Sequence, residues 1–205
     1  MKSNNQLTIL GLSEATLCML FEAIYHLYSK DKPIQIVKNI PYSPKLPFAP
    51  PNANYSIFEE NEVDFSKTDY CLLGVFRAIP KKKVFEYFKK NHNIHQESYT
   101  NLVYPNAVLA STVKLKKGIF INPNVVIAPF AQIGNFVSIN RGVSIGHHTH
   151  IDDFSTLNPA CNVSGNCSLG EGVTVGVGAN IIDGINIGAN TIVGAGSLVT
   201  KDLPA

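Results

Sequence analysis

The strongest constraint on the fold is a six-residue repeat that runs through the second half of the chain. Every sixth residue from Leu109 to Val199 is aliphatic, and the residue two positions before each of these anchors is small or β-branched. Six is a multiple of the strand period of two and does not fit the helical period of 3.6, so the repeat predicts short strands. A hexapeptide period is typical of a parallel β-helix, in which three hexapeptides, or eighteen residues, complete one triangular coil.

In such a coil the anchors point inward and the turns lie at the corners, and successive coils stack at about 4.8 Å, the spacing of paired strands. Two of the four cysteines, Cys161 and Cys167, fall on inward positions two residues before an anchor. We therefore interpret them as small core residues rather than reactive thiols.

The first hundred residues follow a different pattern, in which apolar strands alternate with amphipathic helices. Strands are predicted at 7–12, 33–37, 69–76 and 99–104, helices at 13–30 and 80–90, and a proline-rich loop at 41–55. This alternation predicts a small parallel, Rossmann-like α/β sheet in a domain spanning residues 1–104, followed by a β-helix domain spanning 105–205. The lysines of 80–90 are interpreted as the solvated face of a helix rather than a phosphate-binding patch.

Composition excludes several classes of protein. The 205 residues include 17 basic and 15 acidic side chains, a net charge of +2, which gives no reason to expect a nucleic-acid partner. No apolar run is long enough for membrane insertion, and the N-terminus lacks the apolar core of a signal peptide. We expect a cytoplasmic protein with reduced cysteines.

The turn "GLSE" (11–14) joins the first predicted strand to the first helix. A helix N-terminus after a glycine can receive a phosphate group. The turn has one glycine where a dinucleotide fingerprint has three, and Glu14 would repel an anion. Phosphate binding and a purely structural turn with Ser13 as the helix N-cap both stay open here.

The stretch "SIGHHTHIDD" (144–153) holds a cluster of histidines. His147 and His148 follow the anchor Ile145 at a predicted corner, and His150 stands on the next face. All three are expected to point outward, and because neighbouring corner residues diverge, we do not expect them to converge on zinc.

The residue stacked one coil above His147 is Gly165. A glycine lets a substrate approach the backbone closely, and its N–H would lie one strand spacing from the imidazole. A general base beside an exposed amide donor is the arrangement that acyl transfer requires.

Asn122, Asn140 and Asn158 also stack eighteen residues apart. They are either a ladder that stabilises the corners or, for Asn140 and Asn158, groups that orient an imidazole or a substrate.

With these motifs in place, the chain resembles the hexapeptide-repeat left-handed β-helix acyltransferases. Within them it is similar to the bacillosamine- and perosamine-type nucleotide-sugar N-acetyltransferases and to the sialic acid O-acetyltransferase group. The likeness covers the whole chain and is most specific in "NRGVSIGHHTHIDDFSTLNPACNVSGNCSLGEGVTVGVGANI" (140–181). It implies a homotrimer with active sites between subunits, an N-terminal domain that holds the nucleotide of the sugar, and acetyl-CoA lying along the β-helix, without a metal.

The resemblance also assigns roles to single residues. The catalytic histidine of the family matches His147, the asparagine seven residues earlier matches Asn140, and the glycine whose amide faces the thioester carbonyl matches Gly165. Backbone around Val177 and Ala195 is implied to flank the CoA arm.

Two departures concern the catalytic histidine. The residue after it is acidic in the family and is His148 here, which we still count in the catalytic group, with Asp152 or Asp153 as alternative acidic partners. A second histidine, nine residues further on in the family, is replaced by Thr156, which can hydrogen-bond acetyl-CoA but cannot titrate.

Two further departures lie elsewhere. The glycine-rich first turn of the family is reduced here, which leaves Gly11, Leu12 and Ser13 to contact the nucleotide sugar. Relatives also continue beyond the position of Ala205 into a tail that closes over CoA.

The resulting hypothesis is transfer of an acetyl group from acetyl-CoA to the amine of a nucleotide-linked amino sugar, with a 4-amino-4,6-dideoxyhexose as the expected acceptor. One alternative is O-acetylation of a sugar such as a sialic acid. Another is a non-catalytic β-helix, either a scaffold or an ice-binding face, although the outward residues lack a regular threonine ladder. A third is an N-terminal domain that serves only as a cap, with a small amine as acceptor.

Overall fold

The computed structural model describes residues 6–29, 31–39, 47–68 and 70–205. The chain forms two compact units, Met1–Leu102 and Val103–Ala205. Each unit has its own regular structure and its own buried core.

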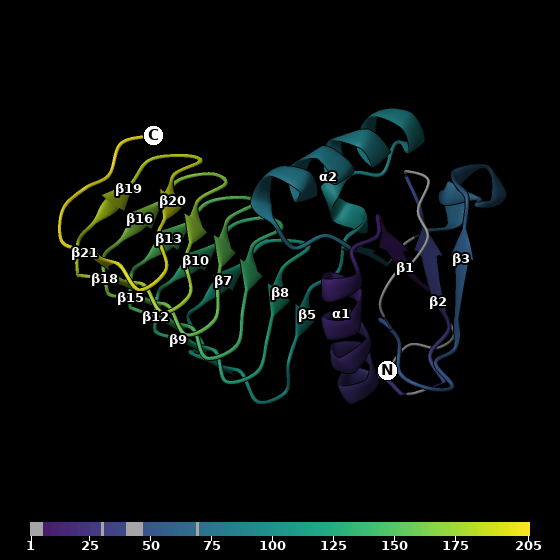
Figure 1. Ribbon diagram of the computed structural model, residues 1–205, viewed down its shortest axis with the longest axis horizontal. Helices are drawn as coiled ribbons and strands as arrows, with labels where there is room; N and C mark the ends of the chain where they lie inside the picture. The colour runs from purple at the N-terminus through teal and green to yellow at the C-terminus, as the bar shows by residue number, and fades with distance from the viewer. Residues whose placement is uncertain (1–5, 30, 40–46, 69) are drawn as a thin grey trace. The chain divides into compact units, whose positions relative to one another are not determined.

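The first unit is built on a four-stranded parallel sheet with the strand order β3-β2-β1-β4. The strands are β1 (Leu7–Leu10), β2 (Ile34–Val37), β3 (Tyr55–Phe58) and β4 (Cys71–Leu73) (Figure 1). All four residues of the inner strand β1 are buried, as expected for a parallel strand covered on both faces.

Two helices follow strands of this sheet. Helix α1 (Glu14–Leu27) follows β1 and buries Leu17, Leu20 and Ile24, which share one face at helical spacing. Helix α2 (Ala78–His92) follows β4. Three short 3₁₀ helices complete the unit, η1 (Glu60–Glu62), η2 (Phe65–Lys67) and η3 (Gln96–Ser98).

The small α/β sheet predicted from the sequence is confirmed, with differences in detail. Strand β3 begins at the last residue of the predicted proline-rich loop, of which 41–46 lie outside the described residues. The strand predicted at 99–104 is shorter, β5 (Leu102–Val103), and pairs within the β-helix because Val103 stands one repeat before Leu109. Lys81 is buried rather than solvated, and burial holds its pKa well below the ordinary lysine value.

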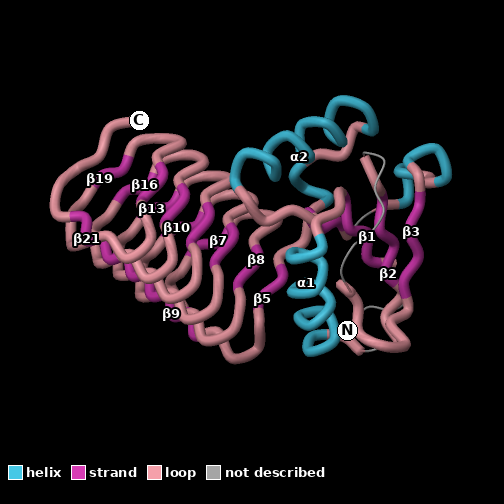
Figure 2. The backbone as a smooth tube through the Cα atoms, in the orientation of Figure 1, coloured by secondary structure: helices cyan, strands magenta, loops and turns pink. Residues whose placement is uncertain are grey.

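The second unit is a left-handed parallel β-helix, as predicted. Its two-residue strands form three sheets, and each coil contributes one strand to each sheet (Figure 2). After β5 the strands are β6 (Val108–Leu109), β7 (Lys114–Leu115), β8 (Phe120–Ile121), β9 (Val126–Ile127), β10 (Gln132–Ile133), β11 (Ser138–Ile139), β12 (Ser144–Ile145), β13 (His150–Ile151), β14 (Thr156–Leu157), β15 (Asn162–Val163), β16 (Ser168–Leu169), β17 (Thr174–Val175), β18 (Asn180–Ile181), β19 (Asn186–Ile187), β20 (Ile192–Val193) and β21 (Leu198–Val199).

The register between coils is eighteen residues throughout, as in the pairs Ser144↔Asn162 and His150↔Ser168. The anchors point inward, and Ile139, Leu157 and Val175 have no exposed surface. Crossovers between parallel strands are normally right-handed because strands twist. Strands of two residues accumulate little twist, so the coils of this repeat can wind in the left-handed direction.

The cysteines are all free thiols, and their burial predicts a large contrast in reactivity. Cys18 is exposed, whereas Cys71, Cys161 and Cys167 are buried. Burial raises the pKa of the Cys161 thiol to about 12 and raises that of Cys167, so little of the reactive thiolate forms at pH 8.

We expect a thiol reagent at pH 8 to modify Cys18 rapidly in the folded protein, and all four cysteines only after unfolding in denaturant. Mass spectrometry of peptides after a short exposure would measure this. Rapid labelling of Cys161 or Cys167 in the folded state would contradict their placement in the core.

Candidate active site

The histidine cluster lies at the corner of the β-helix that follows strand β12 and precedes β13. His147 and His148 are exposed in the turn, and His150 is the first residue of β13. His148 adopts a left-handed backbone conformation with a φ of 57°. Phe130 and Asn166, one coil below and one coil above, do the same. The outward orientation predicted for the cluster is confirmed.

The imidazole of His147 lies against Gly165, in the coil above. A Cβ atom added to Gly165 would be 2.7 Å from His147 Cε1 and 2.8 Å from Nε2. The Gly165 carbonyl accepts a hydrogen bond from the Gly184 N–H, but the Gly165 N–H has no acceptor among the described residues. The imidazole and the glycine are therefore stacked as predicted, and the Gly165 N–H is available to donate to a ligand.

The other ring nitrogen of the same imidazole, Nδ1, contacts His148. The two Nδ1 atoms are 3.2 Å apart, and the rings meet edge to face. The His148 ring also stacks on Phe130, with a centroid distance of 4.9 Å. One of the two nitrogens must donate a proton and the other accept it. If His147 donates from Nδ1, its Nε2 is left unprotonated and faces Gly165.

A carboxylate that the sequence reasoning missed lies near the same point. Asp183 Oδ1 would be 2.8 Å from the added Cβ of Gly165, so it lies no more than 5.6 Å (2.8 + 2.8) from His147 Nε2. Asn166 Nδ2 lies 3.3 Å and 3.4 Å from the two carboxylate oxygens of Asp183. The signal was available, because Asp183 stands one further stacking step of eighteen residues above Gly165.

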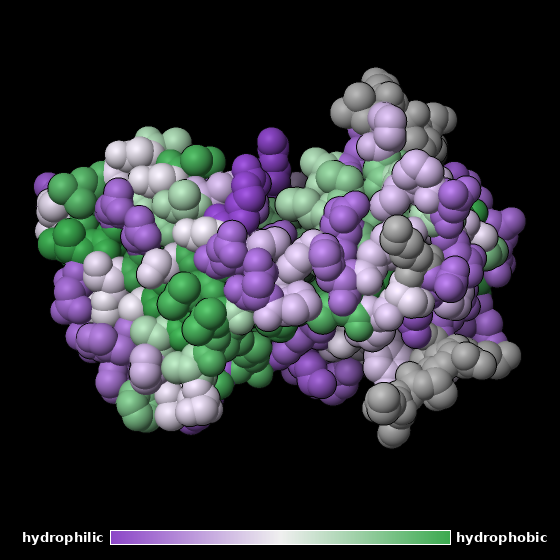
Figure 3. Space-filling view, turned by 90° about the horizontal axis from the view of Figure 1, so that it is seen from below, coloured by the Kyte–Doolittle hydropathy of each residue, from purple (hydrophilic) through white to green (hydrophobic). Residues whose placement is uncertain are grey.

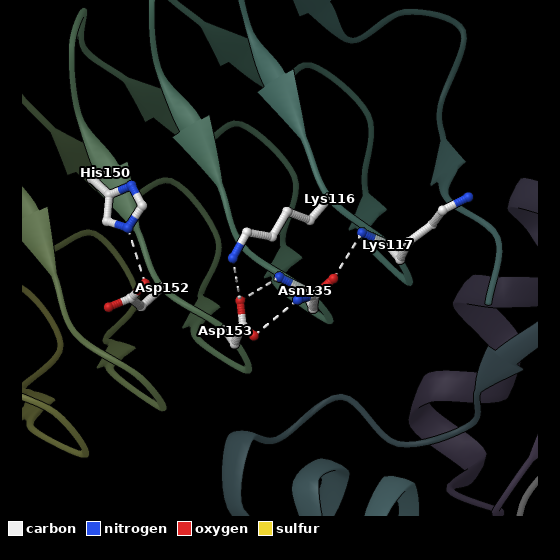
Figure 4. A network of polar contacts seen from close by, with 6 residues as sticks. All are labelled: Lys116, Lys117, Asn135, His150, Asp152 and Asp153. Atoms are coloured by element: carbon white, nitrogen blue, oxygen red, sulfur yellow. Dashed lines mark hydrogen bonds and ion pairs between the residues drawn. The ribbon is translucent and has the colours of Figure 1, made fainter. Parts of the chain in front are cut away.

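The two aspartates considered as acidic partners of His147 have other contacts. Asp152 accepts a hydrogen bond from His150 at 2.9 Å, and Asp153 binds the backbone N–H and side-chain amide of Asn135 (Figure 4). Lys116 is 3.5 Å from Asp153. These residues occupy the next corner of the coil, so within one chain neither aspartate is beside His147.

The stacked asparagines divide into two kinds. Asn122 and Asn158 donate to the carbonyls of Ile139 and Val175 in the next coil, as a stabilising ladder would. Asn140 instead accepts a hydrogen bond from its neighbour's N–H at 2.9 Å. It lies before strand β12 whereas His147 follows it, so one chain does not bring the two residues together.

Apart from Gly165, the residues predicted to contact acetyl-CoA also lie away from His147 within one chain. Thr156 is on β14 and is only 2% exposed. Val177 is 53% exposed in the corner between β17 and β18, and the Gly196 N–H of the next coil donates to its carbonyl, which stacks Ala195 above it. Of the predicted catalytic and CoA-binding residues, one chain therefore unites His147, His148 and Gly165.

The predicted nucleotide contacts lie in the turn between β1 and α1. Gly11 has a φ of 81° and is buried, Leu12 is 9% exposed, and Ser13 is half-buried. Ser13 occupies the N-cap position of α1 but makes no side-chain capping bond. Its hydroxyl is therefore available to a ligand at the positive end of the helix, although Glu14 follows directly.

The structure was also searched for metal sites and membrane spans. In the described part of the chain, no group of three or more His, Cys, Asp or Glu side chains is arranged to hold a metal ion. Neither described helix has the length and hydrophobicity needed to cross a membrane.

Comparison with known proteins identifies structural neighbours only. No family model matches the chain, and no curated protein matches it. A mutant perosamine N-acetyltransferase from Caulobacter crescentus, solved with CoA and GDP-perosamine, is 23% identical over 99% of this chain and 91% of its own, with a TM-score of 0.78. The acetyltransferase domain of PglB from Neisseria gonorrhoeae, solved with acetyl coenzyme A, is 17% identical over 98% and 94%, with a TM-score of 0.77. WeeI from Acinetobacter baumannii is 19% identical over the same shares, with the same TM-score. These likenesses cover both units and show a shared fold.

Proposed function

We propose that this protein is an acetyl-CoA-dependent N-acetyltransferase that acts on a nucleotide-linked amino sugar. The observation that carries the proposal is the pairing of His147 Nε2 with the Gly165 backbone at one exposed corner. Its support from outside the chain is that a neighbour of the same two-unit fold was solved with CoA and GDP-perosamine. The expected sugar remains a 4-amino-4,6-dideoxyhexose.

In the proposed mechanism, the amine nitrogen attacks the thioester carbonyl carbon and forms the new C–N bond. His147 Nε2 accepts the proton that the amine loses, and His148 accepts a hydrogen bond from His147 Nδ1. The Gly165 N–H donates to the oxyanion. When the C–S bond breaks, the imidazolium returns its proton to the CoA sulfur, which leaves as the thiol.

A homotrimer is part of the proposal because one chain leaves the predicted site residues on two corners. Asn140, Thr156, Val177 and Ala195 would reach His147 only if a second subunit supplied them. The outward positions of one sheet are apolar toward its two ends, at Val108, Val126 and Leu198, which are 62%, 46% and 65% exposed. Between them the outward positions are polar, at Ser144, Asn162 and Asn180. Apolar surface is gathered over the β-helix in the space-filling view (Figure 3). Such surface commonly marks a protein interface.

The turn of Gly11, Leu12 and Ser13 is the proposed contact for the nucleotide. Its support is the helix N-terminus with an unused serine hydroxyl. With four free cysteines, the cytoplasm is the proposed compartment.

The test is release of thiol from acetyl-CoA in the presence of nucleotide-linked 4-amino sugars, with UDP, TDP and GDP as carriers. We expect one of them to be acetylated on its amine, which mass spectrometry of the product would locate. Because Cys18 is exposed, the thiol assay should use the Cys18→Ser variant to keep the background low.

Other results would support the alternatives. Acetylation of a hydroxy sugar with no activity on amines would indicate an O-acetyltransferase. Transfer to small amines without a nucleotide would leave the first unit as a structural cap. Failure to bind acetyl-CoA at all would overturn the proposal in favour of a non-catalytic β-helix.

A further inference from the structure

The position of Asp183 raises a question that the proposed mechanism does not answer. His147 Nε2 and Asp183 Oδ1 both lie 2.8 Å from one point, the place where a side chain at residue 165 would begin. Gly165 has no side chain, so both of these side chains can lie against its backbone. The point itself is at bonding distance from Gly165 Cα, but a polar ligand atom that enters from solvent between the two exposed side chains can reach His147 Nε2 and Asp183 Oδ1 together.

The carboxylate is not neutralised by the rest of the corner. Asp183 is exposed, and its contact within the described residues is the neutral amide of Asn166. No described lysine or arginine forms an ion pair with it. A ligand that approaches His147 therefore meets a negative charge with spare hydrogen-bonding capacity.

We propose that Asp183 binds the amino group of the acceptor and selects amines over hydroxyl groups. This inference rests on the proposed acetyl transfer and deepens it. An amine has two or three N–H bonds, so it can donate to Asp183 Oδ1 and to His147 Nε2 together. A hydroxyl group has one O–H and can donate to only one of them.

Charge adds to this selection. Aliphatic amines are largely cationic near neutral pH, and a cation donates a shorter and stronger hydrogen bond to a carboxylate than a neutral group does. Asp183 would hold the ammonium beside His147 until it releases one proton to solvent and becomes the neutral, nucleophilic amine. His147 then accepts the second proton as the amine attacks the thioester. The same charge would repel an acceptor that carries a carboxylate close to the reacting atom.

The role of Asp183 is distinct from that of His147. His147 takes the proton in the reaction, whereas Asp183 binds the acceptor and positions it. Loss of Asp183 should therefore act mainly on acceptor binding, and it should do so only for amines.

The experiment compares wild-type protein with Asp183→Asn, which keeps the shape and can still accept a hydrogen bond but carries no charge. Each is assayed with two acceptors on the same nucleotide, a 4-amino sugar and its 4-hydroxy counterpart. Asp153→Asn is the matched control, because Asp153 is also bound by an asparagine of a neighbouring turn but lies on another corner. Circular dichroism and thermal melting confirm that each variant is folded.

We expect Asp183→Asn to raise KM for the amino sugar about tenfold, with a smaller change in kcat, because one charge-assisted hydrogen bond becomes a neutral one. KM for acetyl-CoA, and any slow transfer to the hydroxy sugar, should stay at the wild-type level. Asp153→Asn should behave as wild type with both acceptors.

Three outcomes would overturn the inference while leaving the proposed function in place. These are unchanged kinetics in Asp183→Asn, a rise in KM for acetyl-CoA alone, or an equal loss with both acceptors. Absence of transfer by the wild-type protein to every acceptor would instead remove the proposed function, and the inference with it.

Discussion

Replacing His147 by alanine should lower kcat by about 10²–10⁴-fold, the contribution expected of a positioned general base. His147 is exposed and its Nε2 faces Gly165, so the substitution removes the base without opening a hole in the core. Fold and acetyl-CoA binding should therefore persist. Steady-state kinetics with the best acceptor, together with thermal melting, would measure both effects.

His150→Ala is the matched control for this loss. His150 stands three residues further on and bonds to Asp152 rather than to the Gly165 corner. It should turn over at close to the wild-type rate. A His147→Ala variant with kcat within a few-fold of wild type would show that the imidazole is not the base, and the mechanism would have to be abandoned.

Replacing Gly165 by alanine should lower kcat/KM by about 10²-fold or more, the loss seen when one oxyanion donor is removed or blocked. The new methyl group would lie 2.7 Å from His147 Cε1 and 2.8 Å from Asp183 Oδ1. Both side chains are exposed and can move aside, so the chain should still fold. The methyl group would, however, crowd the side of Gly165 on which the amine and the thioester must both approach His147 and the Gly165 N–H.

Gly194→Ala provides the comparison for this variant. Its added Cβ would meet only Ser197 Oγ, at 3.1 Å, so folding should survive. Because Gly194 precedes the proposed CoA-binding Ala195, any loss should appear in KM for acetyl-CoA, and kcat should stay close to the wild-type value. Gly146 would be a poor choice, because its added Cβ would lie 2.3 Å from the Gly165 backbone nitrogen and would distort the coil itself. Equal kcat values for Gly165→Ala and Gly194→Ala would exclude the Gly165 amide from the reaction.

The β-helix could be predicted because the six-residue period shows where the strands lie, and three periods show which residues stack on one another. Once the repeat was known, the contact between His147 and Gly165 followed from a step of eighteen residues. The same step taken once more reaches Asp183, so that carboxylate was predictable in principle. The contact between His147 and His148 was not, because it depends on the left-handed backbone of His148 and the rotamers of both rings.

The first unit was harder to predict because its signals are local and weak. Strand β3 follows directly on a proline-rich segment, and its residues are exposed or half-buried rather than apolar throughout. Lys81 was assigned to the solvated face with its neighbours in the sequence, but the turn of α2 places it inward. Burial of a lysine depends on tertiary packing that composition and helical spacing do not reveal.

The fixed register of the β-helix restricts how this sequence can change in length. His147, Gly165 and Asp183 come from three successive coils and meet only because equal lengths of chain separate them. Adding or removing one residue within a strand would exchange inward and outward side chains from there on. Between positions 147 and 183, single-residue substitutions therefore leave the register intact, whereas an insertion must bulge out at a corner or add a whole coil. A whole coil inserted between His147 and Gly165 would separate the base from its amide donor.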